Sequence, residues 1–197
     1  MEKGRTIMQT SKIKIMTMMS LMTAILCILG PITMPIPISP VPISLVTLII
    51  YLSVYILGMK RGTISCLLYL LIGFVGLPVF SGFTGGVGRL LGPTGGYMIG
   101  YAFMAVISGF FIERWITKRV LHMVGMVLGT MICYLFGTTW LSMQAGMSFF
   151  VALGAGVVPF LIGDSLKIIM AVSIGPLIRK RLKRAGLLPD GRRQHGN

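Results

Sequence analysis

Hydrophobic side chains dominate this chain in six long runs, and most polar side chains lie between the runs. A helix needs about 20 mostly apolar residues to cross a bilayer, and the runs approach or exceed that length. They are bounded by glycine, proline or basic residues and cover residues 14–33, 42–58, 62–77, 97–115, 120–140 and 149–178. The pattern therefore predicts an all-α integral membrane protein with six transmembrane helices.

The number of basic residues alternates between high and low from one connector to the next. All but two of the 18 Lys and Arg residues lie in or beside the first segment, the connectors after the second and fourth runs, and the last segment. Connectors rich in Lys and Arg stay in the cytoplasm. Both termini are therefore expected to be cytoplasmic, with residues 1–13 and the basic residues 179–197 as tails of one domain whose bundle spans residues 14–178.

Composition supports a membrane protein and excludes a nucleic-acid-binding one. The mean hydropathy is +0.90 and only 11% of the residues are charged, against about 25% in soluble domains. A net charge of +14 is also found in proteins that bind nucleic acid. However, the basic residues stand in short clusters between hydrophobic runs and form no continuous stripe. Such clusters are typical of segments that touch the anionic surface of a lipid bilayer.

Three charged residues remain once the cytoplasmic clusters and tails are set aside: Arg89, Asp164 and Lys167. Asp164 and Lys167 are three residues apart, so both side chains lie on one face of the sixth predicted helix. With the cytoplasmic end of that helix near Leu177, Asp164 lies roughly 20 Å away along the axis. Charges inside a membrane are costly and usually face a binding site. A salt bridge that only fixes helix packing is the alternative.

Two connectors on the nearly uncharged side have unusual compositions. Residues 77–96 combine many glycines with apolar side chains, which excludes a regular helix and favours a folded loop between the third and fourth helices. Residues 31–42, PITMPIPISPVP, predict a stiff extended segment or a structural hairpin. Together the two connectors are expected to cap an outer pocket. Pro159 predicts a kink or break in the sixth helix just before Asp164.

The sequence contains no recognisable catalytic or metal-binding motif. No HExxH, GxSxG or Walker pattern is present, and His122 and His195 stand apart from other candidate ligands. An enzyme is therefore not expected, and neither a cofactor nor a metal site is predicted. Pairs of small residues four apart instead mark close helix contacts, as in Ser20 with Ala24, Gly96 with Gly100 and Gly125 with Gly129.

Three segments, in order along the chain, resemble one family closely. These are SPVPIS at residues 39–44, GLPVFSGFTGGVGRLLGPTGGYMIG at residues 76–100 and VPFLIGDSLK at residues 158–167. They are similar to the signature stretches of the BioY family, the biotin-specific substrate-binding subunits (S components) of energy-coupling factor (ECF) transporters. The resemblance covers nearly the whole hydrophobic body, residues 17–177.

The resemblance implies a six-helix S component in the plasma membrane of a prokaryote. Such a subunit captures biotin at the outer face and associates with a transmembrane coupling subunit and two ATPase subunits. The family's behaviour further implies that the small residues Ser20 and Ala24 of the first helix pack against the coupling subunit.

Biotin carries a ureido ring, an apolar thiophane ring and a carboxylate, and the candidate residues match these groups. Asp164 can accept a hydrogen bond from a ureido N–H, while Lys167 and Arg89 can meet the ureido oxygen or the carboxylate, with the assignment of each cation left open. Aromatic and neighbouring polar side chains complete the expected site, because good pockets are mostly apolar with a few polar groups. The remaining expected ligand-binding residues are Phe83, Thr84, Tyr97 and Thr47.

Other functions are compatible with the same charges. A stand-alone ion-coupled carrier would use Asp164 as its protonatable group, although such carriers usually show inverted repeats and broken helices in both halves. A non-transporting membrane scaffold would use the pair for packing alone. An S component for another vitamin would keep the bundle and differ in the chemistry of its pocket.

Overall fold

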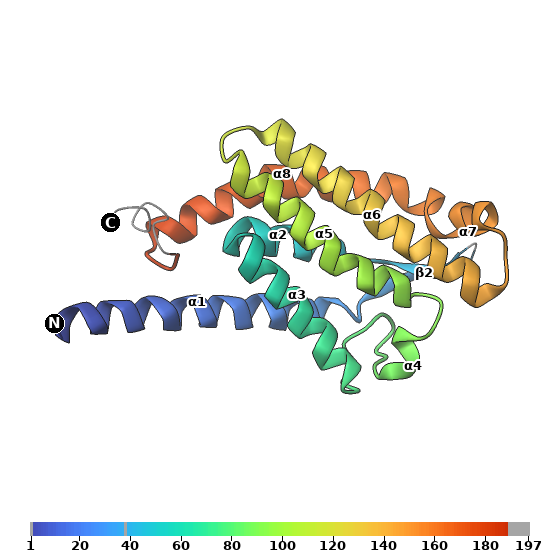
Figure 1. The fold of residues 1–197 in the computed structure, drawn as a ribbon, viewed down its shortest axis with the longest axis horizontal. Helices are drawn as coiled ribbons and strands as arrows, with labels where there is room; N and C mark the ends of the chain where they lie inside the picture. The colour runs from blue at the N-terminus through green and yellow to red at the C-terminus, as the bar shows by residue number, and fades with distance from the viewer. Residues whose placement is uncertain (1, 38, 189–197) are drawn as a thin grey trace.

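The computed structural model describes residues 2–37 and 39–188, which form one mostly helical body (Figure 1). The helices follow in the order α1 Glu2–Leu29, α2 Val46–Leu57, α3 Met59–Phe74, α4 Val87–Leu90, α5 Gly95–Arg114, α6 Arg119–Ala145, α7 Phe149–Gly156, the 3-10 turn η1 Val158–Phe160 and α8 Leu161–Arg184. A two-stranded antiparallel sheet, β1 Thr33–Ile36 and β2 Ser39–Ser44, lies between α1 and α2.

Four helical segments of the described chain are long and apolar enough to cross a membrane. They are residues 12–29 of α1, α5, α6, and the segment from Phe149 to Arg184 that contains α7 and α8. The remaining long helices are shorter than a full crossing, with 12 residues in α2 and 16 in α3. The count of six membrane crossings therefore stays a prediction.

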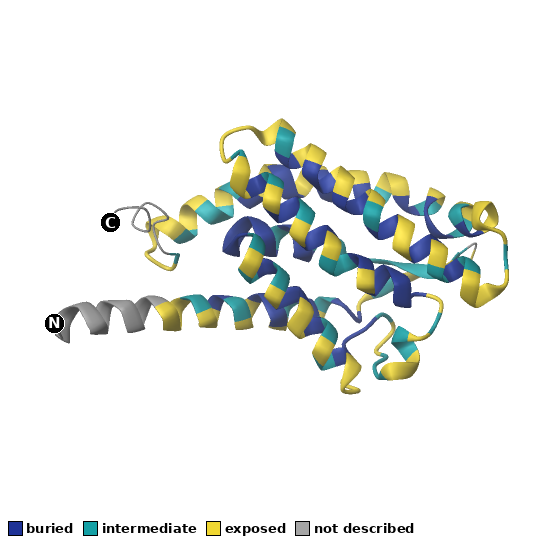
Figure 2. Cartoon of the chain, viewed as in Figure 1, coloured by how far each residue is buried: buried dark blue, intermediate teal, exposed yellow. Residues whose placement is uncertain are grey.

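The start of α1 and the end of α8 lie at the same end of the molecule, and the sheet and α7 lie at the other (Figure 1). Buried residues lie on the sides of the helices that face one another, and exposed residues lie on their outer sides (Figure 2). Many of the exposed side chains are large and apolar, including Leu67, Phe110 and Leu135. An apolar outer surface is what a bundle surrounded by lipid needs, because lipid tails are as apolar as leucine.

Glycines allow α5 and α6 to approach closely, as their spacing predicts. A Cβ atom on Gly100 would lie 2.8 Å from the Cα atom of Cys133, and one on Gly129 would lie 2.9 Å from Ser108 Oγ. A Cβ atom on Gly125 would overlap the ring of Phe111. The prediction that these spacings mark helix contacts is confirmed for α5 and α6.

The first connector differs from the all-α prediction, because it forms the β1–β2 hairpin. Thr33 pairs with Ser44 and Met34 with Ile43, and an irregularity in the register follows before Ile36 pairs with Ser39. Proline is tolerated here because each strand of a two-stranded sheet has an unpaired edge, where a missing N–H breaks no ladder. The hairpin alternative for this connector is therefore the one observed.

The glycine-rich connector between α3 and α5 folds against the end of α3. Phe80 is fully buried, stacks edge-on against Tyr69 at 5.6 Å between ring centroids and fills the space above Gly73. The backbone N–H of Gly86 donates to the carbonyl of Gly73 at 2.7 Å, and that of Gly82 donates to Pro31 at 3.0 Å. These contacts direct the connector toward α3 and α1.

The expected break near Pro159 is confirmed, since α7 ends at Gly156 and α8 begins at Leu161, with Pro159 inside η1. The two terminal helices extend beyond the predicted bundle of residues 14–178, whose bounds stay a prediction. Helix α8 continues to Arg184 through the first six residues of the predicted C-terminal tail, and α1 begins at Glu2 inside the predicted N-terminal tail.

Candidate ligand-binding pocket

The first turns of α8 hold a buried ion pair. Lys167 Nζ lies 2.8 Å from Asp164 Oδ1, and each residue is only 7% exposed. The prediction that both side chains share one helix face is confirmed. Asp164 lies in the first turn of α8, where the positive end of the helix dipole stabilises a carboxylate. The break at Pro159 thus places a helix start, and with it an acid, inside the bundle.

Two further helices supply hydrogen bonds to the same carboxylate. The hydroxyl of Tyr134 on α6 donates to Asp164 Oδ2 at 2.5 Å, and the hydroxyl of Thr47 on α2 makes a long bond of 3.5 Å to Asp164 Oδ1. Sequence reasoning selected Thr47 and missed Tyr134. A buried tyrosine hydroxyl usually finds a hydrogen-bond partner, so a tyrosine in the middle of a hydrophobic run was the available signal.

The pair borders a narrow cavity of about 50 Å³ between the β1–β2 hairpin and the bundle. Apolar and aromatic side chains make up much of its wall, and Thr47, Tyr134 and Lys167 form a hydrogen-bonded group around Asp164. The cavity is lined by Val41, Pro42, Ser44, Thr47, Tyr97, Tyr101, Met104, Thr130, Cys133, Tyr134, Gly156, Phe160, Asp164 and Lys167. Drug-sized ligands occupy pockets of about 300 Å³ or more. A guest of that size therefore requires the hairpin or the lining side chains to move outward.

The tyrosines around the cavity differ in how they are bonded. Tyr97 donates to the carbonyl of Gly156 at 2.9 Å. Thr130 also lines the cavity and shares a 2.5 Å hydrogen bond with Tyr51, which does not line it. Tyr101 lines the cavity and makes no side-chain hydrogen bond to the described residues. Its hydroxyl can therefore pair with a guest without first leaving a protein partner.

The expected site residues divide into two groups. Asp164, Lys167, Thr47 and Tyr97 line the cavity, whereas Arg89, Phe83 and Thr84 do not. The physical reason is the packing of Phe80 against α3, which holds the glycine-rich connector beside that helix. The hairpin thus lines the cavity without residues of the second connector, contrary to the expectation that both cap it.

The three residues outside the cavity lie in the glycine-rich connector. Phe83 is 69% exposed and has a positive φ of 57°. Thr84 donates its hydroxyl to the carbonyl of Ser81 at 2.9 Å. Arg89 lies in α4, and its Nε is buried without a hydrogen-bond partner among residues 2–37 and 39–188.

The chain matches a known family over nearly its whole length. A model of the BioY family matches residues 3–184. The chain belongs to the BioY family.

Named relatives of this BioY chain are transporters rather than enzymes. The protein is 32% identical to "Biotin transporter BioY2" of Lactococcus lactis subsp. cremoris, a match that covers 85% of this chain and 91% of the relative. It is 37% identical to "Biotin transporter BioY" of Thermotoga maritima, covering 76% and 85% of the two chains.

A solved structure is also similar to this BioY chain. The protein superimposes with a TM-score of 0.81 and 34% identity on the 2.1 Å crystal structure of the S-component for biotin from an ECF-type ABC transporter. The match covers 87% of this chain and 93% of the other. Most of the backbone described above is therefore shared with that protein.

Helix α1 of this BioY chain leaves one face uncovered. Ser20 and Ala24 are exposed, and only 22% of the apolar segment of α1 is buried against 56% for α5. Residues 12–37 and 39–188 contain no group of three or more His, Cys, Asp or Glu side chains that could hold a metal ion.

Proposed function

We propose that this protein is the high-affinity biotin-binding subunit of an ECF-type vitamin uptake transporter. The observation that carries the proposal is the hydrogen-bonded Asp164–Lys167 pair bordering a cavity beneath the hairpin. Replacing a buried ion pair by apolar packing is often neutral or stabilising, so packing alone is a weak reason to keep one. The names of the relatives identify biotin as the ligand to test first.

The chemistry of biotin suits the groups at the cavity. A ureido N–H can donate to the carboxylate of Asp164, which already gathers donors from three helices. Lys167 can donate to the ureido oxygen or to the carboxylate of the ligand, and aromatic walls such as Tyr97 and Phe160 suit the thiophane ring. Hydrogen bonds to charged groups contribute about 1.5–3 kcal/mol each. Two or three of them give substantial affinity in a site closed to water.

A ligand in the cavity can contact Arg89, Phe83 and Thr84 only if the glycine-rich connector moves toward the hairpin. The buried Nε of Arg89 favours such a movement, because an unpaired buried donor is costly. A ligand carboxylate would satisfy that donor.

The proposed topology has six membrane crossings with both termini in the cytoplasm of a prokaryote. The clustering of Lys and Arg at the end of the molecule shared by the start of α1 and the end of α8 supports this orientation. The hairpin and the cavity then face the outside, where biotin is captured.

The proposed partners are a transmembrane coupling subunit and two ATPases that drive release inside. The exposed small residues Ser20 and Ala24 on the uncovered face of α1 suit a close helix contact with the coupling subunit. Larger side chains at both positions should weaken assembly and leave biotin binding intact.

Mass spectrometry of small molecules released from gently purified protein tests the ligand. Biotin should be present, and calorimetry should then give binding to biotin but not to thiamin or riboflavin. Asp164→Asn and Lys167→Ala should each weaken binding at least about tenfold, since each removes a charge-assisted hydrogen bond.

Either of two results contradicts the proposal. Preferential binding of another vitamin would retain the S-component fold and replace the ligand, whereas unchanged biotin affinity in both variants would remove the proposed site. Biotin uptake by protein reconstituted alone, driven by a proton gradient and lost in Asp164→Asn, would favour the stand-alone carrier.

A further inference from the structure

A second, larger pocket lies at the basic end of the bundle, far from the biotin site. Its volume is about 320 Å³, and it is lined by Tyr55, Ile112, Ile116, His122, Pro176, Arg179, Lys180, Lys183 and Arg184. Pro176 follows Asp164 by about 18 Å along α8, at 1.5 Å per residue. The two pockets share no lining residue, so the proposed function makes no use of this one.

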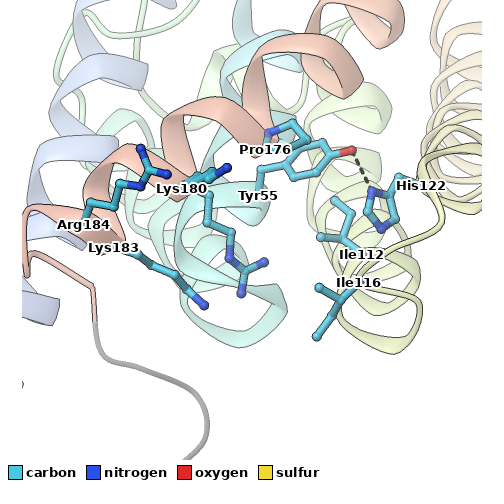
Figure 3. A pocket seen from close by; sticks show the side chains of 9 residues that line it. Tyr55, Ile112, Ile116, His122, Pro176, Lys180, Lys183 and Arg184 are labelled. Atoms are coloured by element: carbon cyan, nitrogen blue, oxygen red, sulfur yellow. Dashed lines mark hydrogen bonds between the residues drawn. The ribbon is translucent and has the colours of Figure 1, made fainter.

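The walls of this basic pocket separate into an apolar side and a charged side. Figure 3 shows Ile112, Ile116 and His122 on one side and Lys183 and Arg184 on the other. The ring of Tyr55 and Pro176 lie between them (Figure 3). The pocket therefore offers one surface to an apolar group and the other to a charged group.

The neutral polar groups of the pocket already bond to each other. His122 Nε2 lies 2.8 Å from the carbonyl oxygen of Trp115, which can only accept, so Nε2 carries the hydrogen. Nδ1 of the neutral ring then accepts from the hydroxyl of Tyr55 at 3.0 Å. The groups left to bind a ligand are mainly cations.

Those cations make no salt bridge within the described chain. The only salt bridge among the described side chains is the distant Asp164–Lys167 pair. The carboxylate of Glu113 is close enough to act on Arg179 electrostatically, and it also accepts the backbone N–H of Met59 at 2.8 Å. One acid cannot neutralise four cations, so this wall of the pocket stays strongly positive. The four cations are Arg179, Lys180, Lys183 and Arg184.

We infer that this pocket binds an anionic phospholipid, with the phosphate against the cations of α8 and an acyl chain against the isoleucines. The pocket lies at the end of membrane-spanning helices, where headgroups are found, and basic pockets between such helices suit anionic headgroups. Ile116 is 70% exposed beside it, which gives the chain an apolar path from the pocket to the bilayer. A free phosphate ion would gain nothing from that apolar side.

Binding of three soluble probes to the full-length protein in neutral detergent tests the inference. The probes are dioctanoyl phosphatidylglycerol, dioctanoyl phosphatidylcholine and inorganic phosphate. Each basic residue near an anionic lipid is worth about a fivefold change in affinity, so Arg179→Gln with Lys183→Gln should weaken phosphatidylglycerol binding about 25-fold. Biotin affinity should be unchanged.

A charge-matched control distinguishes a site from diffuse attraction. Arg181 on the same helix and Lys60 on α3 are exposed and line no part of the pocket, so Arg181→Gln with Lys60→Gln should change binding less than about threefold. Equal losses in the two double variants would overturn the inference. So would equal binding of phosphatidylcholine, or competition by inorganic phosphate at the concentration of the lipid.

Two further measurements test the inference even if the double variant Arg179→Gln with Lys183→Gln fails to fold. Native mass spectrometry of the unmodified protein in an equal mixture of the two lipids should retain phosphatidylglycerol preferentially, and equal retention would refute the site. Ile116→Ser, at an exposed position, should weaken lipid binding several-fold, and an unchanged affinity would exclude contact with the acyl chain.

Discussion

The two pockets near opposite ends of α8 differ in whether their charged side chains are paired with an opposite charge. Near the start of α8, one acid and one base are buried, paired at 2.8 Å and supported by Tyr134, beside a cavity of about 50 Å³. Near its end, four cations without salt bridges to other described residues line a pocket of about 320 Å³. Charge is tolerated deep in the bundle when the protein itself compensates it, and it stays uncompensated only where headgroups and water are within reach.

The sharpest way to break this comparison is to remove the buried pair altogether. Asp164→Leu with Lys167→Met should abolish detectable biotin binding, a loss of more than about 100-fold, because two charge-assisted contacts disappear together. Thermal stability should be retained or increased, since apolar side chains of similar volume pack well in place of a buried ion pair. Calorimetry and thermal unfolding of the same sample measure both effects, and retained affinity would assign the pair to packing alone.

Removing a supporting hydroxyl should have a smaller effect. Tyr134→Phe deletes the donor to Asp164 Oδ2 and should weaken biotin binding about tenfold, close to the lower end of the 1.5–3 kcal/mol expected of a hydrogen bond to a charged group. Tyr69→Phe is the matched control, because Tyr69 donates to the carbonyl of Val79 and does not line the cavity. It should lower stability and leave affinity intact; a similar loss in both would indicate a general packing defect.

Two glycines of α7 test the wall of the narrow cavity. A Cβ atom on Gly156 would overlap the hydroxyl of Tyr97, whereas one on Gly154 meets nothing within 4 Å. Gly156→Ala should therefore cost about 1–3 kcal/mol of stability by overpacking and also weaken biotin binding. Gly154→Ala should be neutral or stabilising by up to about 1 kcal/mol. Thermal unfolding and calorimetry compare the pair, and equal effects would contradict the packing described here.

The smallest effect is expected from removing the hydrogen bond between Tyr55 and His122 in the basic pocket. Tyr55→Phe leaves His122 Nδ1 without its donor and should reduce stability by about 1 kcal/mol. Biotin affinity should not change, because Tyr55 lies outside the cavity at the other end of α8. A change in biotin affinity above about threefold would show that the two ends of α8 are coupled.

Local rules predicted much of this fold because they depend on neighbours in the chain. The spacing of Asp164 and Lys167 placed them on one helix face, and Pro159 marked the break before α8. The glycines of α5 and α6 marked a close contact, since only small residues let helix backbones approach.

Contacts between distant segments could not be predicted in the same way. The role of Tyr134 depends on α6 lying beside α8, and 30 residues separate it from Asp164. The placement of Arg89 depends on Phe80 filling the space above Gly73, a contact that glycine content alone does not reveal. The prolines of the first connector suited both an extended segment and a hairpin, and pairing between Thr33 and Ser44 decided between them.

The sequence by itself determined that the chain is an apolar helical protein with most of its cations at one end, because hydropathy and charge act on each residue wherever it lies. It also determined which two residues form the buried pair, since helix geometry sets their spacing. Tertiary structure alone decided that Tyr134 supports this pair, that the hairpin lines the cavity without the glycine-rich connector, and that the cations of α8 face an apolar wall. Each of these depends on which segments fill the space beside one another, and close packing is a property of the whole bundle.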